Sequence, residues 1–326
     1  MDDLASLLSS AWGLPAPQIN PSSQGADRNS RLFEVRDSSG ARRVLKWRRG
    51  PVNHAALRLP LYMGDSGAQA FLAPVETSAG ELHVPVSGGY LALLPHIDGH
   101  DAFERPLNAG AWRQLGQALR TLHDAQLPGR LRRTLPQDGF DTQSLVLLRQ
   151  LLDRPLTSLP DPAARQLDKL LRVHKATLSW LMDQSNSLAL QLRRRDLPVV
   201  PCHGDIHAGN VLVDSGNQLF LVDFDTLQLA ARARDLMFVG AGVAGHWQGE
   251  QECAWFYEGY GPAQPDPEAI AFYRCERIVA DVLDYSRQIL NGGTVQEREF
   301  ALAELQRQLA QGPELLVARA SVEALA

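Results

Sequence analysis

The segment from Pro201 to Thr226 constrains the fold of this chain more than any other stretch. It reads PCHGDIHAGNVLVDSGNQLFLVDFDT, with β-prone residues around small polar turns. Asp205 and Asn210 stand five positions apart in the first turn, and Asp223 follows the apolar run Leu219–Val222. Aspartate and asparagine also form ordinary turns. Three such residues in this order, between β-prone segments, favour a catalytic role over a purely structural one.

The spacing matches the protein-kinase pattern H-R-D-x-x-x-x-N followed by D-F-G. Phosphoryl transfer needs an aligned nucleophile and charge compensation around the transferring group. An aspartate within hydrogen-bond reach of an acceptor hydroxyl can take its proton, and we predict this role for Asp205. Mg²⁺ prefers hard oxygen ligands, and we predict Asn210 and Asp223 as its ligands.

The first hundred residues read mainly as strands. A short helix is expected over Asn53–Met63, and Pro60 should kink or end it. Turn residues separate the strands into two hairpins. The expected strands are Arg31–Arg36, Arg42–Trp47, Glu81–Val86 and Tyr90–Leu94.

Beyond residue 100 the apolar residues recur at helical spacing. Leucines between Leu167 and Leu181 follow this pattern, and Asp266-Pro267 predicts the start of a helix that runs to about Leu290. We therefore expect an α+β fold with two lobes. The predicted boundaries are 1–95 for a small β-rich N-terminal lobe and 96–326 for a larger helical C-terminal lobe.

Lys46 is the candidate for binding nucleotide phosphates. It lies in the strand-like run Val44-Leu45-Lys46 and is the only lysine in the first hundred residues. Protein kinases pair such a lysine with a helix glutamate, but no Asp or Glu occurs between Lys46 and Asp65. The loop Gln24–Ser30 lies where a phosphate-covering loop is expected, which makes Asn29 and Ser30 candidate nucleotide contacts.

The chain resembles the aminoglycoside phosphotransferase and choline kinase family at its H-G-D-x-x-x-x-N and D-x-D motifs, His203 to Asn210 and Asp223 to Asp225. The resemblance implies a protein-kinase-like fold, Mg²⁺ with ATP or GTP as cofactors, and adenine bound by backbone at Leu94 and His96. Four stretches narrow it to the spectinomycin-phosphorylating members of that family. They are DIHAGNVLV at 205–213, RDLMF at 234–238, FYEGYG at 256–261 and YRCERIV at 273–279.

The charge distribution suggests the class of acceptor. Residues 201–290 hold thirteen acidic side chains and five arginines, which favours a cationic small molecule and disfavours nucleic acid. Carboxylates are natural partners for the amines of an aminocyclitol, and an aromatic ring could stack on it. For each carboxylate a structural ion pair is an equal alternative. The candidate acceptor contacts are Asp225, Asp235, Trp247, Glu276 and Asp281.

The predicted function is ATP-dependent phosphorylation of a hydroxyl on an aminocyclitol or aminoglycoside antibiotic, with spectinomycin as the first choice. A kinase of choline, a sugar or homoserine is one alternative, and a nucleotide-binding pseudokinase is another, suggested by the missing helix glutamate. Three separated cysteines and a start without a basic, apolar leader predict a cytoplasmic protein that contacts no membrane. The oligomeric state is left open.

Overall fold

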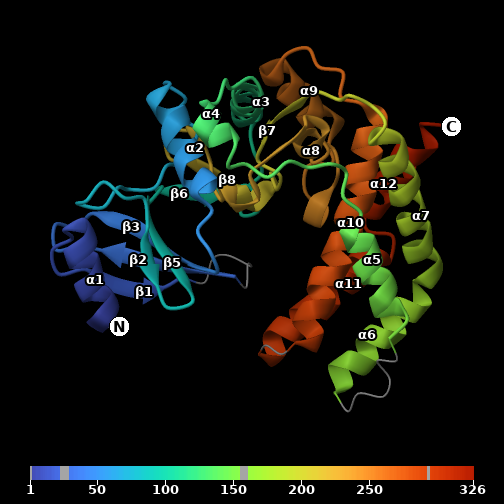
Figure 1. Cartoon of the computed structure of the whole chain (residues 1–326), viewed down its shortest axis with the longest axis horizontal. Coiled ribbons are helices and arrows are strands. Elements are labelled where there is room, and N and C mark those ends of the chain that lie inside the picture. Colours follow the sequence, from blue (N-terminus) through green and yellow to red (C-terminus); the bar gives the residue numbers. More distant parts are fainter. Residues whose placement is uncertain (1, 23–28, 155–160, 292–293) are drawn as a thin grey trace. The chain divides into compact units, whose positions relative to one another are not determined.

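The computed structural model describes residues 2–22, 29–154, 161–291 and 294–326. The chain forms two compact units (Figure 1). The sheet unit comprises Met1–Pro136 and Gly209–Leu227, and the helical unit comprises Gln137–Ala208 and Gln228–Ala326.

The sheet unit is built on five antiparallel strands in the order β1-β2-β3-β5-β4. Both expected hairpins are present within this sheet. In the first, the Asp37 carboxylate accepts a hydrogen bond from the backbone N–H of Ser39 (2.9 Å), and Gly40 adopts the positive φ that the turn requires. The strands are β1 (Gln18–Pro21), β2 (Ser30–Arg36), β3 (Arg42–Arg49), β4 (Val84–Val86) and β5 (Gly89–Pro95).

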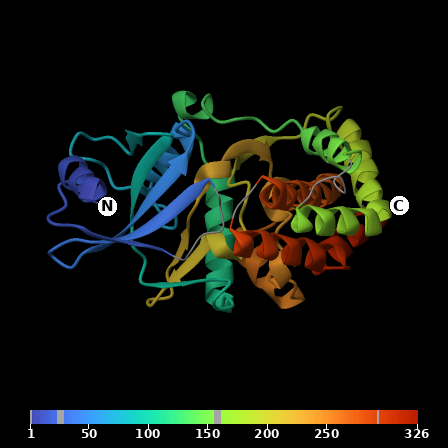
Figure 2. The same cartoon turned by 90° about the horizontal axis from the view of Figure 1, so that it is seen from below.

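The two faces of this sheet pack against different helices, because successive side chains along each strand point to opposite faces. On one face, Leu45 packs with buried side chains of helix α1 (Asp2–Trp12), which lies beside the sheet in Figure 2. This helix was not predicted from the sequence. On the other face, Tyr90 and Ala92 pack against helix α2 (His54–Asp65). Lys46 and Arg48 alternate with Leu45 and share this second face.

Helix α2 does not end at Pro60, contrary to one of the two outcomes expected. The Asn53 side chain accepts a hydrogen bond from the backbone N–H of Ala56 and caps the helix, which continues past Pro60 to Asp65. Pro60 itself is buried on the apolar side of α2. The free energy gained by burying the apolar side of α2 offsets the loss of the backbone hydrogen bond that a proline inside a helix removes.

The segment Gly209–Leu227, which holds the predicted metal ligands, belongs to the sheet unit. Strand β8 pairs with both β6 and β9, and Leu221 forms an isolated bridge with Phe71. The compact units therefore differ from the lobes expected at residue 95. The remaining elements of this unit are β6 (Gly99–Asp101), α3 (Ala109–His123), α4 (Gly129–Arg132), β8 (Val211–Asp214), β9 (Leu219–Leu221) and the 3-10 helix η3 (Phe224–Thr226).

The helical unit is organised around helix α10 (Pro267–Leu290), which has the predicted bounds. Its cap is the Asp266 carboxylate, which accepts a hydrogen bond from the backbone N–H of Ala269 (3.0 Å). A two-stranded ladder joins β7 (Val199–Cys202) to β10 (Gln228–Ala231). The other helices are α5 (Gln143–Leu152), α6 (Pro162–Val173), α7 (Lys175–Leu192), α8 (Ala233–Leu236), α9 (Glu250–Tyr260), α11 (Val295–Leu309) and α12 (Pro313–Glu323).

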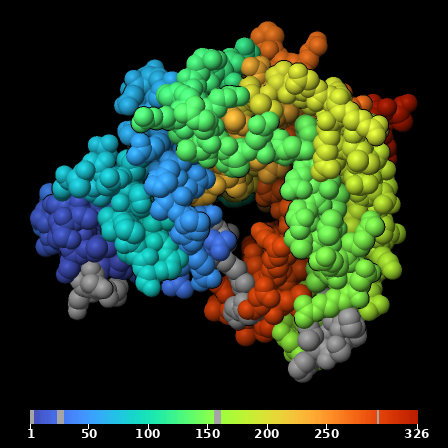
Figure 3. Space-filling model, viewed as in Figure 1, coloured from blue at the N-terminus to red at the C-terminus, as the bar shows by residue number. Residues whose placement is uncertain are grey.

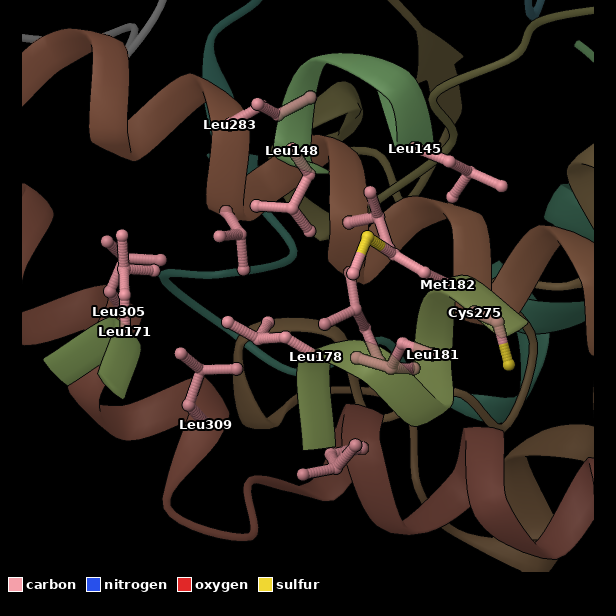
Figure 4. Close-up of a cluster of buried hydrophobic side chains, with 14 of the residues drawn as sticks. Leu145, Leu148, Leu171, Leu178, Leu181, Met182, Cys275, Leu283, Leu305 and Leu309 are labelled. Atoms are coloured by element: carbon pink, nitrogen blue, oxygen red, sulfur yellow. The ribbon is translucent and has the colours of Figure 1, made fainter. Parts of the chain in front are cut away.

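The core of the helical unit joins side chains from six helices, α5, α6, α7, α10, α11 and α12, and part of it is drawn in Figure 4. Leu178 and Leu181 of α7, predicted from their spacing, are fully buried there, as are Val279 and Val282 of α10. In Figure 3, helices α5, α6 and α7, green to yellow, form one face of this unit. Because α10 packs against several neighbours, its side chains are held firmly in place. Among the described residues, no helix has the length and apolar character needed to cross a membrane.

Candidate active site

The lysine on strand β3 lies between two carboxylates. The Nζ atom of Lys46 lies 3.0 Å from Asp223 Oδ1 and 2.6 Å from Asp225 Oδ2. Its side chain is only 12% exposed. Burial acts to lower the pKa of Lys46, but the two carboxylates outweigh it and raise the pKa above its ordinary value. Lys46 is therefore positively charged at neutral pH, and its ammonium group is held beside the two aspartates of the D-x-D motif.

Asp225 is a carboxylate partner of Lys46 in a chain that has no Asp or Glu between Lys46 and Asp65. Besides Lys46 it pairs with Arg48, whose Nη1 atom lies 3.1 Å from Asp225 Oδ2. The Asn53 side chain, which caps α2, also donates a hydrogen bond to the backbone carbonyl of Asp225 (3.3 Å). Asp225 was predicted to contact the acceptor. In the structure it belongs to the cluster that surrounds Lys46.

The β8–β9 hairpin carries the two predicted metal ligands. Asn210 lies immediately before β8 and is buried, and its backbone carbonyl accepts a hydrogen bond from Val222 (3.1 Å). Asp223 follows β9 with a left-handed backbone (φ 63°, ψ 69°), an uncommon conformation for a residue other than glycine. An amide oxygen and a carboxylate are hard donors of the kind Mg²⁺ prefers, so this pair fits a magnesium site.

The other predicted nucleotide contacts lie on or beside the same sheet. The backbone carbonyl of Asn29 accepts a hydrogen bond from Arg49 (2.7 Å), and Ser30 begins β2. Leu94 pairs with Val44 of β3, and His96 follows the end of β5. The remainder of the expected phosphate loop, 24–28, lies outside the described residues.

In the helical unit, Asp205 follows a tight turn that Asp235 holds. The Asp235 carboxylate accepts hydrogen bonds from the backbone N–H groups of His203 (2.8 Å) and Gly204 (2.7 Å). Asp235 is fully buried, and Gly204 has the positive φ (85°) that favours glycine. Asp235 was predicted as an acceptor contact. In the structure it anchors this turn through hydrogen bonds from the backbone.

The Asp205 carboxylate is paired with an arginine. Arg277 on α10 donates from Nη1 to Asp205 Oδ1, and His207 Nε2 lies 3.6 Å from Asp205 Oδ2. Burial acts to raise the pKa of Asp205, but Arg277, with smaller contributions from His207 and His203, holds it well below the ordinary range. Asp205 is therefore an ionised carboxylate at neutral pH.

The remaining predicted acceptor residues also have protein neighbours. Glu276 accepts a hydrogen bond from Ser144 Oγ (3.0 Å) and lies 3.5 Å from Arg234 Nη1. Trp247 is buried and has a positive φ (61°). Asp281 accepts a hydrogen bond from Arg277 Nε (2.8 Å). Each of the four predicted carboxylates is thus engaged by protein donors. Asp225, Glu276 and Asp281 form ion pairs, as the alternative anticipated, and Asp235 accepts backbone hydrogen bonds.

Two arginines of these clusters were not predicted as site residues from the sequence. Arg48 stands two residues after Lys46, so strand alternation alone places it on the same face. Arg277 and Asp281 are four residues apart, a spacing that pairs side chains on a helix. These local signals were available in the sequence. The contact between Arg277 and Asp205 spans 72 positions and had no local signal.

Comparison with known proteins shows the family and the fold of the chain. Residues 24–273 match the phosphotransferase enzyme family. The structure of spectinomycin phosphotransferase APH(9)-Ia in complex with ADP and spectinomycin superposes with a TM-score of 0.88, at 26% identity, over 98% of both chains. Amicoumacin kinase hAmiN, at 15% identity and a TM-score of 0.62 over 94% of this chain and 92% of its own, shares the fold.

A choline/ethanolamine kinase of Mus musculus is 32% identical over 115 residues, which are 34% of this chain. The match spans only 23% of the mouse protein. The kinase-like fold therefore extends over nearly the whole chain, while the likeness to the mouse protein is local.

Proposed function

Because the chain belongs to the phosphotransferase enzyme family, we propose that it transfers the γ-phosphoryl group of ATP to a hydroxyl of a small molecule. The observation that carries this proposal is the contact of Lys46 with Asp223 and Asp225. A buried lysine and an aspartate suited to Mg²⁺ are two of the groups that a kinase-type phosphate site uses. The lysine therefore has carboxylate partners despite the absent helix glutamate, which removes the main reason to expect a pseudokinase.

The residues have distinct roles in the proposed reaction. Lys46 binds the α- and β-phosphates, with Asn29, Ser30, Leu94 and His96 as the further proposed contacts with the nucleotide. Asn210 and Asp223 would hold Mg²⁺, which when bound offsets charge on the phosphates. GTP is an alternative phosphoryl donor.

Asp205 orients the acceptor hydroxyl and receives its proton. The hydroxyl oxygen forms a bond to the γ-phosphorus, the bond from that phosphorus to the β,γ-bridging oxygen breaks, and ADP leaves. A carboxylate with a lowered pKa is a weak base, so it does not remove an alcohol proton in advance. Proton transfer late in a loose transition state suits such a base.

We propose an aminocyclitol as the acceptor, with spectinomycin as the first compound to test. The likeness to spectinomycin phosphotransferase supports this choice, since it covers 98% of both chains. The local identity with a choline/ethanolamine kinase supports amino alcohols as the second class. Because the predicted carboxylates already have protein partners, the amines would have to share or displace those partners.

The test is phosphorylation with ATP and Mg²⁺ across spectinomycin, other aminocyclitols, aminoglycosides, choline, ethanolamine and sugars, with the product detected by mass spectrometry. We expect spectinomycin to gain one phosphoryl group, and Asp205→Asn to abolish the product. Nucleotide binding without phosphorylation of any compound would contradict the proposal. Turnover that survives in Asp205→Asn would contradict the role of that residue.

A further inference from the structure

Arg277 on helix α10 is held between two carboxylates of the helical unit. Its Nη1 atom donates to Asp205 Oδ1, and its Nε atom donates to Asp281 Oδ1 at 2.8 Å. The guanidinium also lies over the ring of Phe238, 5.4 Å from the ring centroid. A planar group with contacts on two edges and one face has little freedom to rotate.

Asp281, which holds the Nε side of Arg277, is itself held by a second hydrogen bond. Asp281 lies one helical turn further along α10, and its second oxygen accepts a hydrogen bond from Gln308 Nε2 of α11 (2.9 Å). The next residues on α10, Ile278 and Val279, are buried in the core of the unit. The arginine therefore projects from the best packed helix of the unit, with its Nε edge locked by Asp281.

Two further groups face Asp205. His207 Nε2 lies 3.6 Å from Asp205 Oδ2, and His203 Nδ1 accepts a hydrogen bond from the backbone N–H of Asp205 (3.4 Å). Neither contact is as short as that of Arg277. The buried Asp235 fixes the backbone of the preceding turn, but it does not fix the carboxylate torsion of Asp205.

We infer that Arg277, locked by Asp281, is the positioning residue that sets the orientation of the Asp205 carboxylate. A guanidinium presents donors in a rigid fork, so it can fix Asp205 Oδ1 and Asp281 together, whereas an ammonium is a point charge. The effect of this orientation on catalysis rests on the proposed function of Asp205. The arrangement also gives Asp281 a task other than acceptor binding.

The first test is spectroscopic and does not depend on turnover. In the ¹⁵N-arginine-labelled full chain, slow rotation about Nε–Cζ resolves the two Nη signals of a clamped guanidinium, while a free one shows their average. We expect resolved signals for Arg277, assigned by their loss in Arg277→Lys, and averaged signals in Asp205→Asn and Asp281→Asn. Arg287 on the same helix is 53% exposed and serves as the averaged reference. Averaged Arg277 signals in the wild type would overturn the inference.

The second test is kinetic, with ATP and spectinomycin. Misplacement of a catalytic group by about 1 Å can cost about 10²-fold in rate, so Arg277→Met should lower kcat by about this factor and leave the KM for ATP unchanged. Arg277→Lys should recover part of the loss, because it restores the charge without the fork. Arg287→Met is the matched control on α10 and should behave as wild type.

The outcomes separate the inference from the proposed function. Resolved Arg277 signals in a chain that phosphorylates no compound support the positioning role and contradict the proposed function. Wild-type kcat in Arg277→Met, confirmed as folded by its melting temperature, overturns the inference and leaves the proposed function standing. Full recovery of the wild-type kcat in Arg277→Lys would show that a positive charge alone is enough to position Asp205, and this result would also overturn the inference.

Discussion

Lys46 Nζ lies closer to Asp225 (2.6 Å) than to Asp223 (3.0 Å), the aspartate that fits a metal ion. Both carboxylates of the D-x-D motif therefore contact the lysine, and Asp225 also contacts Arg48. We propose that Asp225 orients the lysine and that Asp223 is the metal ligand. One motif would then supply what protein kinases take from a motif aspartate and a helix glutamate.

Replacement of Asp225 by asparagine should weaken nucleotide use and stability together. It leaves two mostly buried cations with one carboxylate fewer, and loss of one partner from a buried pair costs about 3 kcal/mol. We expect a higher KM for ATP and a lower melting temperature, measured by steady-state kinetics and circular dichroism. Asp98→Asn is the control, because that side chain is 90% exposed and lies 3.7 Å from Arg42. An unchanged KM for ATP would remove Asp225 from the nucleotide site.

Lys46→Met should damage nucleotide use more than acceptor affinity. Methionine keeps the aliphatic stem but removes the charge that binds the phosphates, and loss of such an electrostatic contact costs about 10²- to 10³-fold in rate. Initial rates at varied ATP and varied spectinomycin separate the two effects. Lys169→Met, on the exposed side of α6, provides the matched control. If the KM for ATP and kcat both stay at wild-type values, Lys46 has no role in the site.

The low pKa of Asp205 predicts how activity depends on pH. Burial acts to raise this pKa, and Arg277 with the two histidines lowers it below its usual value near 3.8. A carboxylate of this kind stabilises the fold above its unfolded pKa, and the contribution is lost as pH falls through the lower folded pKa. Protonation of Asp205 should therefore cause no loss of kcat between about pH 5 and pH 8.

Arg277→Met removes the main group that lowers the pKa of Asp205. Burial, which raises this pKa, is then no longer opposed by the arginine. The pKa of Asp205 should rise, and an acidic limb should move toward neutral pH in the profile of kcat. Arg287→Met should keep the wild-type profile. Profiles of the same shape in all three proteins would show that Arg277 does not control the ionisation of Asp205.

The sequence predicted the parts of the fold that local patterns determine. The expected strands of the sheet and the bounds of α10 were confirmed, since alternation and capping residues encode them. Helix α1 was missed although Leu4, Leu8 and Trp12 recur at helical spacing. In the candidate site, the spacing of Asp205, Asn210 and Asp223 predicted roles that stay predictions, and their partners depended on tertiary contacts. No local pattern pairs Asp205 with Arg277, or Lys46 with Asp225, which stand 72 and 179 positions apart.

Asp235 anchors the turn that precedes Asp205. Both oxygens of Asp235 accept hydrogen bonds from backbone N–H groups, and the residue is fully buried. Asparagine has nearly the same shape but only one acceptor oxygen, so Asp235→Asn leaves one buried N–H facing a donor, at a cost of about 1–3 kcal/mol. We expect a lower melting temperature and faster hydrogen exchange at His203 and Gly204, with a reduced kcat because the turn carries Asp205. Asp284→Asn, an exposed aspartate on α10, is the control and should match wild type. Unchanged exchange at the two amides in Asp235→Asn would show that the carboxylate does not hold the turn.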